Sequence, residues 1–201
     1  MRVYVATTNA GKLREMEALF ADTPFALATF AGYEGPLEGD TSYADNAALK
    51  ARALHAQLAR AGRPSNVLAD DSGLEVHALG GRPGVLTAYY GGAELAWEQR
   101  REKLLRELAE RGSADRRARF VCALHFIDVA GREFATLATV DGAIAGAQRG
   151  ALGFSFDPVF FYPPAGLTFA EMSAEAKNRV SHRAIAAAAL GVAVARAGAG
   201  A

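Results

Sequence analysis

Cysteine is nearly absent from this sequence of 201 residues, in which Cys122 stands alone within an apolar run. A disulfide within the chain is therefore excluded, and a reducing compartment is the expected location. Neither sign of charge is in excess, because 22 Lys and Arg residues balance 22 Asp and Glu residues. A net charge of zero argues against a nucleic-acid polymer or a membrane surface as the partner, since both attract a basic excess.

Long hydrophobic runs are also missing. No window approaches the roughly 18 consecutive apolar residues of a membrane-spanning helix, and the N-terminal segment lacks the long apolar stretch of a signal peptide. The histidines do not have the spacing of a zinc site, and Ser72 lacks the surroundings of a hydrolase nucleophile. We therefore expect a cytoplasmic protein without a membrane partner.

What the sequence contains instead is an alternation of strand and helix patterns, followed by a hairpin with its turn at Ala130–Gly131. This order predicts an α/β fold, with a mixed central sheet, helices on both faces and a second lobe built around the hairpin. We expect residues 1–197 to form a single two-lobed domain and residues 198–201 to be a disordered tail. The predicted strands cover 2–7, 25–30, 66–70, 117–128, 132–146 and part of 153–164, and the predicted helices follow residue 12, begin near Ser42, and cover 93–110 and 173–196.

Two adjacent aspartates, Asp70 and Asp71, follow an apolar run at the point where the pattern predicts that a strand ends and a turn begins. Like charges this close repel each other unless water or a cation stabilises them. The doublet therefore either forms a solvated turn or faces a cation, and these few residues leave both interpretations open.

Residues 7–12, with the sequence TTNAGK, lie between a predicted strand and a predicted helix. Backbone N–H groups at a helix N-terminus attract anions, and Lys12 adds a full positive charge, so the segment could bind phosphate. An ordinary helix cap by Asn9 explains the same residues equally well. Glu15 shares a helical face with Lys12 and either orients the lysine or forms a surface ion pair.

Two further groups of polar side chains allow a functional and a structural interpretation. Asn46 and Lys50 lie four residues apart and so share one face of a predicted helix, where Lys50 is either solvated or a second phosphate ligand. Lys177, His182 and Arg183 gather near the start of the last predicted helix, either as a solvated basic face or as donors to one ligand.

Three segments together carry a family resemblance: TTNAGKLREME, LADDSGLEVHALGGRPGV, and GFSFDPVFF followed by FAEMSAEAKNRVSHRA. In this order and spacing they resemble the inosine triphosphate pyrophosphatase family, specifically its bacterial dITP/XTP members, over residues 3 to about 190. The resemblance implies an elongated two-lobed α/β protein, usually a homodimer, with its substrate in the cleft between the lobes. It implies Mg²⁺-dependent hydrolysis of noncanonical purine nucleoside triphosphates (dITP, ITP, XTP) to the monophosphate and pyrophosphate, which cleanses the nucleotide pool.

The resemblance also assigns roles by position. Asp71 becomes the proton acceptor and, with Glu38, a metal ligand. Asp70 is also predicted as a metal ligand because it neighbours Asp71, and whether it coordinates the metal directly is left open. Lys12, Lys50 and Lys177 would offset, with Mg²⁺, the charge of roughly −4 on a nucleoside triphosphate. The predicted substrate-binding residues are Thr7, Thr8, Asn9, Ala10, Gly11, Lys12, Lys50, Ser72, Phe154, Ser155, Phe156, Asp157, Lys177, His182 and Arg183.

The resemblance also makes His182 and Arg183 the pair that recognises the base. Both are donors that suit the C6 carbonyl of inosine and xanthosine, whereas adenine carries an amino group there. One of Phe154 and Phe156 would stack on the purine, and the other is expected to be a core residue.

Several positions depart from the family pattern. Ser155 and Phe156 replace a usual Gly and Tyr, His77 replaces an acidic residue, and Tyr89 replaces an arginine. These departures affect the expected substrate preference and dimer contacts more than the reaction type. Two alternatives therefore remain: a nucleotide-binding module with little turnover, and a pyrophosphatase with a shifted base preference, for example toward pyrimidines.

Overall fold

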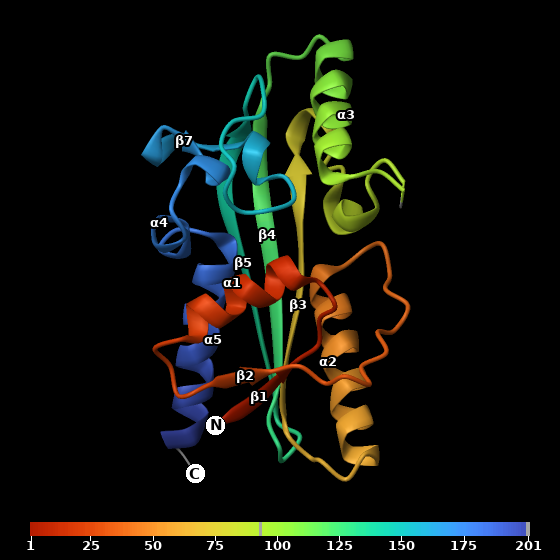
Figure 1. The fold of residues 1–201 in the computed structure, drawn as a ribbon, viewed down its shortest axis with the longest axis vertical. Coiled ribbons are helices and arrows are strands. Elements are labelled where there is room, and N and C mark those ends of the chain that lie inside the picture. The colour runs from red at the N-terminus through yellow and green to blue at the C-terminus, as the bar shows by residue number, and fades with distance from the viewer. Residues whose placement is uncertain (93, 200–201) are drawn as a thin grey trace. The chain divides into compact units, whose positions relative to one another are not determined.

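The computed structural model describes residues 1–92 and 94–199, and within these residues the strands form one mixed sheet in the order β2-β1-β3-β4-β5-β6-β7 (Figure 1). Strand β1 pairs in parallel with β2 and β3, whereas β6 pairs antiparallel with β5 and β7. The strands are β1 (Arg2–Val5), β2 (Ala26–Ala28), β3 (Asn66–Val76), β4 (Arg117–Ile127), β5 (Glu133–Ile144), β6 (Phe160–Tyr162) and β7 (Leu167–Thr168). The helices are α1 (Ala10–Phe20), α2 (Tyr43–Arg60), α3 (Trp97–Glu110), α4 (Ala174–Asn178) and α5 (His182–Ala199), with 3-10 turns at His77–Leu79, Gly84–Tyr89, Asp157–Val159, Pro163–Ala165 and Phe169–Glu171.

The chain divides into two compact units, each with its own hydrophobic core. Unit 1 comprises residues 1–71, 122–138 and, within the described range, 182–199, and unit 2 comprises the described residues of 72–121 together with 139–181. No helix within the described ranges is long and apolar enough to cross a membrane.

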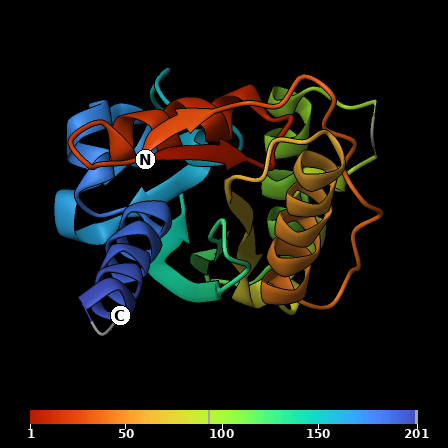
Figure 2. The ribbon, with the colours of Figure 1, turned by 90° about the horizontal axis from the view of Figure 1, so that it is seen from below.

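In unit 1, side chains alternate between the two faces of the sheet, as the period of two in a strand requires. Leu68 packs on one face with residues of α1 and α5, and its neighbours Val67 and Ala69 pack on the other face with residues of α2. Figure 2 shows α5 and α2 on opposite sides of these strands. The predicted mixed sheet with helices on both faces is therefore confirmed, and the same alternation sends Asp70 and Asp71 to opposite faces.

In unit 2, helix α3 packs Leu104 and Leu108 into a core with aromatic side chains of β4 and β6, Phe120 and Phe160. The core also contains Phe156.

Strand β3 differs from its prediction because it does not end before the aspartates but continues to Val76. The predicted turn at the Asp70–Asp71 doublet is therefore wrong. The small residues Ser72 and Gly73 looked like turn signals, but a strand tolerates them when neighbouring strands supply the hydrogen bonds.

The last predicted helix, 173–196, is divided in two, because α4 ends at Asn178 and α5 begins at His182. The break falls where the chain passes from unit 2 to unit 1. Helix α5 extends to Ala199 and so includes two residues of the predicted disordered tail, while Gly200 and Ala201 lie outside the described residues. Helix α3 begins at Trp97, and Ala93, at the start of the predicted helix 93–110, also lies outside the described residues.

Candidate active site

The loop between β1 and α1 ends in a helix cap. The side chain of Asn9 accepts hydrogen bonds from the N–H groups of Gly11 at 2.9 Å and Lys12 at 3.1 Å, which the first turn of α1 cannot satisfy by itself. The N–H group of Asn9 donates in turn to Oγ1 of Thr7 at 3.1 Å. The predicted cap is therefore present, and it fixes the point from which Lys12 extends.

Asp70 is bound by cations from α1 and α5. Its carboxylate pairs with Nζ of Lys12, and its Oδ2 accepts hydrogen bonds from Nε of Arg183 and the thiol of Cys122, both at 3.1 Å. Nη1 of Arg183 also contacts Oε2 of Glu15 at 2.5 Å. These five residues, which we call the Asp70 network, form a buried chain of alternating charges from Glu15 through Arg183 and Asp70 to Lys12.

Asp71 belongs to a different group on the α2 side of the sheet. Nζ of Lys50 lies 2.8 Å from Oδ1 of Asp71 and 2.9 Å from Oε2 of Glu38. Nδ2 of Asn46 lies 3.3 Å from Oδ2 of Asp71, so the predicted shared face of Asn46 and Lys50 is confirmed. The side chain of Asn46 also bonds both the N–H and the carbonyl of Gly39, which holds the loop that carries Glu38. We call Glu38, Asn46, Lys50 and Asp71 the Asp71 group.

The pKa values of the two aspartates move in opposite directions. Burial would raise the pKa of the Asp70 carboxyl, but Lys12 and Arg183 hold it well below its ordinary value, so Asp70 stays an anion. Burial raises the pKa of Asp71, and the attraction of Lys50 does not fully offset it. Asp71 is therefore the aspartate suited to accept a proton, and Asp70 is suited to fix cations in place.

Asp71 and Glu38 offer oxygen ligands that fit a magnesium ion. Both carboxylates contact the same ammonium group, so both reach one point in space. Proteins commonly hold Mg²⁺ by one or two carboxylates, together with water and substrate phosphates. Within residues 1–92 and 94–199, no group of three or more His, Cys, Asp or Glu side chains is placed to hold a metal ion.

Asp70 does not share this arrangement. One of its oxygens is bound by Lys12 and the other by Arg183 and Cys122, and the side chain has no exposed surface. The predicted ligation of a metal by Asp70 therefore finds no support in its contacts.

Unit 2 holds a second set of predicted residues around Asp157. Oδ2 of Asp157 accepts a hydrogen bond from the N–H of Phe154 at 2.8 Å and lies 2.5 Å from Nζ of Lys177. The ammonium group lies 5.4 Å from the centre of the Phe154 ring, within the range of a cation–π interaction. A Cβ at Gly153 would lie 2.2 Å from Oδ2 of Asp157, so glycine is required for this close approach.

Ser155 and Phe156 clarify two of the departures from the family pattern. Ser155 adopts φ of 58°, the left-handed backbone that favours glycine, and its carbonyl accepts a hydrogen bond from Nη1 of Arg101 at 2.7 Å. Phe156 is fully buried, with its ring 5.6 Å from that of Trp97 and 6.0 Å from that of Tyr90. Phe156 is therefore the core member of the phenylalanine pair, and stacking of Phe154 on the purine stays a prediction.

The remaining predicted residues are placed as follows. Thr8 and Ala10 are exposed beside the capped helix start, and Ser72 is half-buried in β3 directly after Asp71. His182 and Arg183 are both buried at the start of α5. Arg183 was predicted to recognise the base, and in the structure it contacts the carboxylates of Glu15 and Asp70. Base recognition by His182 and Arg183 stays a prediction.

Sequence reasoning assigned no substrate-binding or metal-binding role to three residues of these groups: Glu15, Asn46 and Cys122. The spacing of Asn46 and Lys50 was a usable signal, because residues four apart on a helix share a face. Glu15 carried the comparable signal of its spacing from Lys12. Cys122 carried none, because its contact with Asp70 depends on the pairing of β3 with β4.

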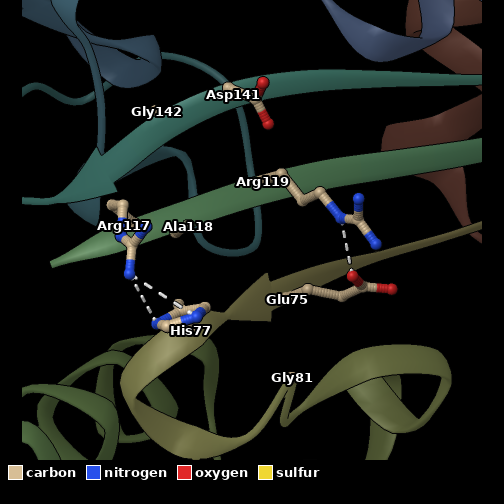
Figure 3. Close-up of a pocket in the computed structure, with 8 residues that line it drawn as sticks. All are labelled: Glu75, His77, Gly81, Arg117, Ala118, Arg119, Asp141 and Gly142. Atoms are coloured by element: carbon tan, nitrogen blue, oxygen red, sulfur yellow. Dashed lines mark hydrogen bonds and ion pairs between the residues drawn. The ribbon is translucent and has the colours of Figure 1, made fainter. Parts of the chain in front are cut away.

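Unit 2 also contains a concave site of about 560 Å³ on its sheet (Figure 3). Several of its charged side chains form ion pairs: Nε of Arg119 lies 2.7 Å from Oε2 of Glu75, and Arg117 and His77 both contact the neighbouring Asp115. The site contains His77, one of the departures from the family pattern, but none of the predicted substrate-binding residues. The lining residues are Glu75, His77, Gly81, Arg117, Ala118, Arg119, Asp141 and Gly142.

Comparisons with known proteins agree with the resemblance. The sequence pattern of the Ham1 family matches residues 3–192. A relative from Geobacillus kaustophilus, named dITP/XTP pyrophosphatase, is 46% identical over 186 residues, which cover 90% of this chain and 88% of the relative. A solved structure of a HAM1 protein from Coxiella burnetii matches with a TM-score of 0.83 and 30% identity, over 98% of this chain and 99% of that chain. The solved Ham1 protein of Staphylococcus aureus matches with a TM-score of 0.79 and 33% identity, over 96% of this chain and 98% of that chain.

Proposed function

Because this chain belongs to the Ham1 family, we propose that it hydrolyses noncanonical purine nucleoside triphosphates such as dITP, ITP and XTP to the monophosphate and pyrophosphate. The observation that carries the proposal is the convergence of Asp71 and Glu38 on the ammonium group of Lys50. Two carboxylates that meet at one point form a cation site, and a hard cation beside lysines is the arrangement that polyphosphate chemistry requires.

In this mechanism, a Mg²⁺ ion held by Asp71 and Glu38 would screen the phosphate charge and make a water molecule more acidic. Asp71 accepts a proton from the water that attacks the α-phosphorus. The bond from that phosphorus to the bridging oxygen breaks, and pyrophosphate leaves with the electron pair. The raised pKa of Asp71, caused by burial, makes this carboxylate a better proton acceptor than an ordinary aspartate.

Lys12 and Lys50 bind the triphosphate. An ammonium group carries three donors, so Lys50 can keep both carboxylate partners and still donate to a phosphate oxygen. Lys12 can do the same while paired with Asp70. The substrate contacts assigned to Ser72, Phe154, Asp157 and Lys177 stay predictions, as do magnesium as the metal, the homodimer and the cytoplasmic location.

A substrate panel tests the proposal. Purified protein is incubated with Mg²⁺ and dITP, XTP, dUTP, GTP or ATP, and the monophosphate and pyrophosphate are measured for each. We expect dITP and XTP to be hydrolysed far faster than GTP or ATP, and chelation of the metal to stop the reaction. Preference for dUTP would establish the shifted base preference instead, and tight binding without pyrophosphate release would establish a binding module.

The variant Asp71→Asn tests the assigned proton acceptor. Loss of a general base lowers rates by roughly 10²–10⁴-fold, so we expect a fall in kcat of that size with the unfolding temperature unchanged within a few degrees. Asp22→Asn, at an exposed position after α1, is the matched control and should leave kcat unchanged. Full activity of Asp71→Asn would contradict the assignment.

A further inference from the structure

Glu15 is a member of the Asp70 network that the proposed mechanism does not use. Its carboxylate is largely buried and lies 2.5 Å from Nη1 of Arg183, whose side chain is 4% exposed. A buried ion pair of this kind is not the surface pair that the spacing of Glu15 from Lys12 would ordinarily indicate. The pair needs a physical reason beyond the stability of α1.

The connections of Arg183 supply that reason. Arg183 binds Glu15 through Nη1 and Asp70 through Nε, and Asp70 binds Lys12. Lys12 and Glu15 lie in the first half of the same helix, while Asp70 comes from β3 and Arg183 from α5. The contacts therefore form a closed circuit that begins and ends on α1, and they restrain the lysine from three elements.

The balance of charge in this circuit decides where Lys12 points. Lys12 and Arg183 compete for the same carboxylate, and Glu15 draws on the charge of Arg183 from its other side. If Glu15 were neutral, Arg183 would attract Asp70 more strongly. The change would be substantial because charges in a buried site are only weakly screened. Lys12, which is the more exposed of the two cations, would then be released toward solvent.

We propose that Glu15 is a positioning residue that acts through Arg183 and Asp70 to hold the ammonium group of Lys12 in the place where it binds the triphosphate. The inference rests on the proposed function, since it concerns how the same substrate is bound. Glu15 acts through its contact with Arg183, so its effect belongs to binding and depends on Lys12.

A double-mutant cycle tests this dependence. The affinity for a non-hydrolysable α,β-imido analogue of dITP, with Mg²⁺, is measured by calorimetry for wild type, Glu15→Gln, Lys12→Met and the double variant. We expect Glu15→Gln to weaken binding about tenfold when Lys12 is present and less than twofold in the Lys12→Met background, because contacts that act as a unit are not additive. In steady-state assays, the KM of Glu15→Gln for dITP should rise by a similar factor, with kcat reduced less.

Controls separate positioning from general damage. Glu17→Gln, at an exposed position on the same helix, should leave affinity unchanged. Glu15→Asp keeps the charge and should bind the analogue within about threefold of wild type. If Glu15→Gln fails to fold, Glu15→Asp replaces it in the cycle, and its loss of affinity should likewise disappear in the Lys12→Met background. Equal losses with and without Lys12, or no loss at all, would overturn the inference. Wild-type hydrolysis of dITP in the same assays shows separately whether the proposed function holds.

Discussion

At the scale of single residues, the backbone conformation of Ser155 shows how a serine is accommodated where the family usually has glycine. Ser155 stands where the family usually has glycine, and it still adopts the left-handed backbone with φ of 58°. The loop that presents Phe154 and Asp157 therefore keeps the conformation of a glycine-containing loop. The departure adds a side chain and backbone strain to this loop.

The variant Ser155→Gly should consequently be slightly more stable than wild type. Left-handed backbone costs a non-glycine residue roughly 1–2 kcal/mol, and the greater freedom of glycine in the unfolded chain offsets about 0.5–1 kcal/mol of the gain. We expect the free energy of unfolding to rise by about 0.5 kcal/mol, measured by urea denaturation. Ser65→Gly, where φ is not positive, should instead destabilise the protein. A clear loss of stability in Ser155→Gly would mean that the serine hydroxyl makes contacts that outweigh the strain.

At the scale of elements, the boundary between β1 and α1 combines a helix cap with a proposed role in phosphate binding. Asn9 caps α1 by accepting from two N–H groups at its start, and Lys12 extends from the same turn. The two interpretations of residues 7–12 are thus compatible, because a cap fixes the geometry from which a phosphate-binding loop would act.

Substitutions of Asn9 separate the two roles. Aspartate caps helices as well as asparagine does, so Asn9→Asp should keep the stability of the protein, whereas Asn9→Ala should lose about 1 kcal/mol. The added negative charge of Asn9→Asp should weaken binding of the dITP analogue by tenfold or more through repulsion of the phosphates. Urea denaturation and calorimetry provide the two measurements, and unchanged affinity of Asn9→Asp would place the triphosphate elsewhere.

At the scale of the whole molecule, ion pairs make the stability of the protein depend on pH, and Glu133 provides an example. The side chain of Glu133 is only half-buried, and it accepts hydrogen bonds from Arg52 at 2.7 Å and His125 at 2.8 Å. The hydrogen bond from Arg52 lowers the pKa of Glu133 from 4.5 to about 2. A carboxyl with a lowered pKa in the folded protein stabilises it above pH 4.5, and this contribution is lost as the pH falls toward 2.

The variant Glu133→Gln should therefore unfold more easily than wild type near neutral pH, and the difference should shrink between pH 4.5 and pH 2. Urea denaturation at several pH values measures this convergence. Other acidic groups with lowered pKa values, Asp70 among them, affect both proteins alike and cancel in the comparison. Glu110→Gln, at an exposed position on α3, serves as the control. A difference that does not change with pH would mean that the ion pair acts through packing alone.

Much of the fold followed from periodicity. The strand and helix patterns of the first half predicted β1, α1, β2 and α2, because a half-buried strand alternates every second residue and an amphipathic helix every third or fourth. The hairpin of β4 and β5 followed from the turn at Ala130–Gly131. The end of β3 could not be predicted from periodicity. Ser72 and Gly73 favour turns by themselves, and they join a strand only when neighbouring strands pair with them.

By itself the sequence determined the family, the α/β class and the types of residue that a cation and a polyphosphate require, because these depend on composition, spacing and local periodicity. Only the tertiary structure decided which side chains contact each aspartate of the doublet. One register of β3 sends Asp70 toward Lys12, Arg183 and Cys122 and Asp71 toward Lys50 and Glu38. Adjacent residues in a strand point to opposite faces of the sheet. Two identical neighbouring side chains therefore meet different partners, which makes Asp70 a stable anion and Asp71 a candidate base.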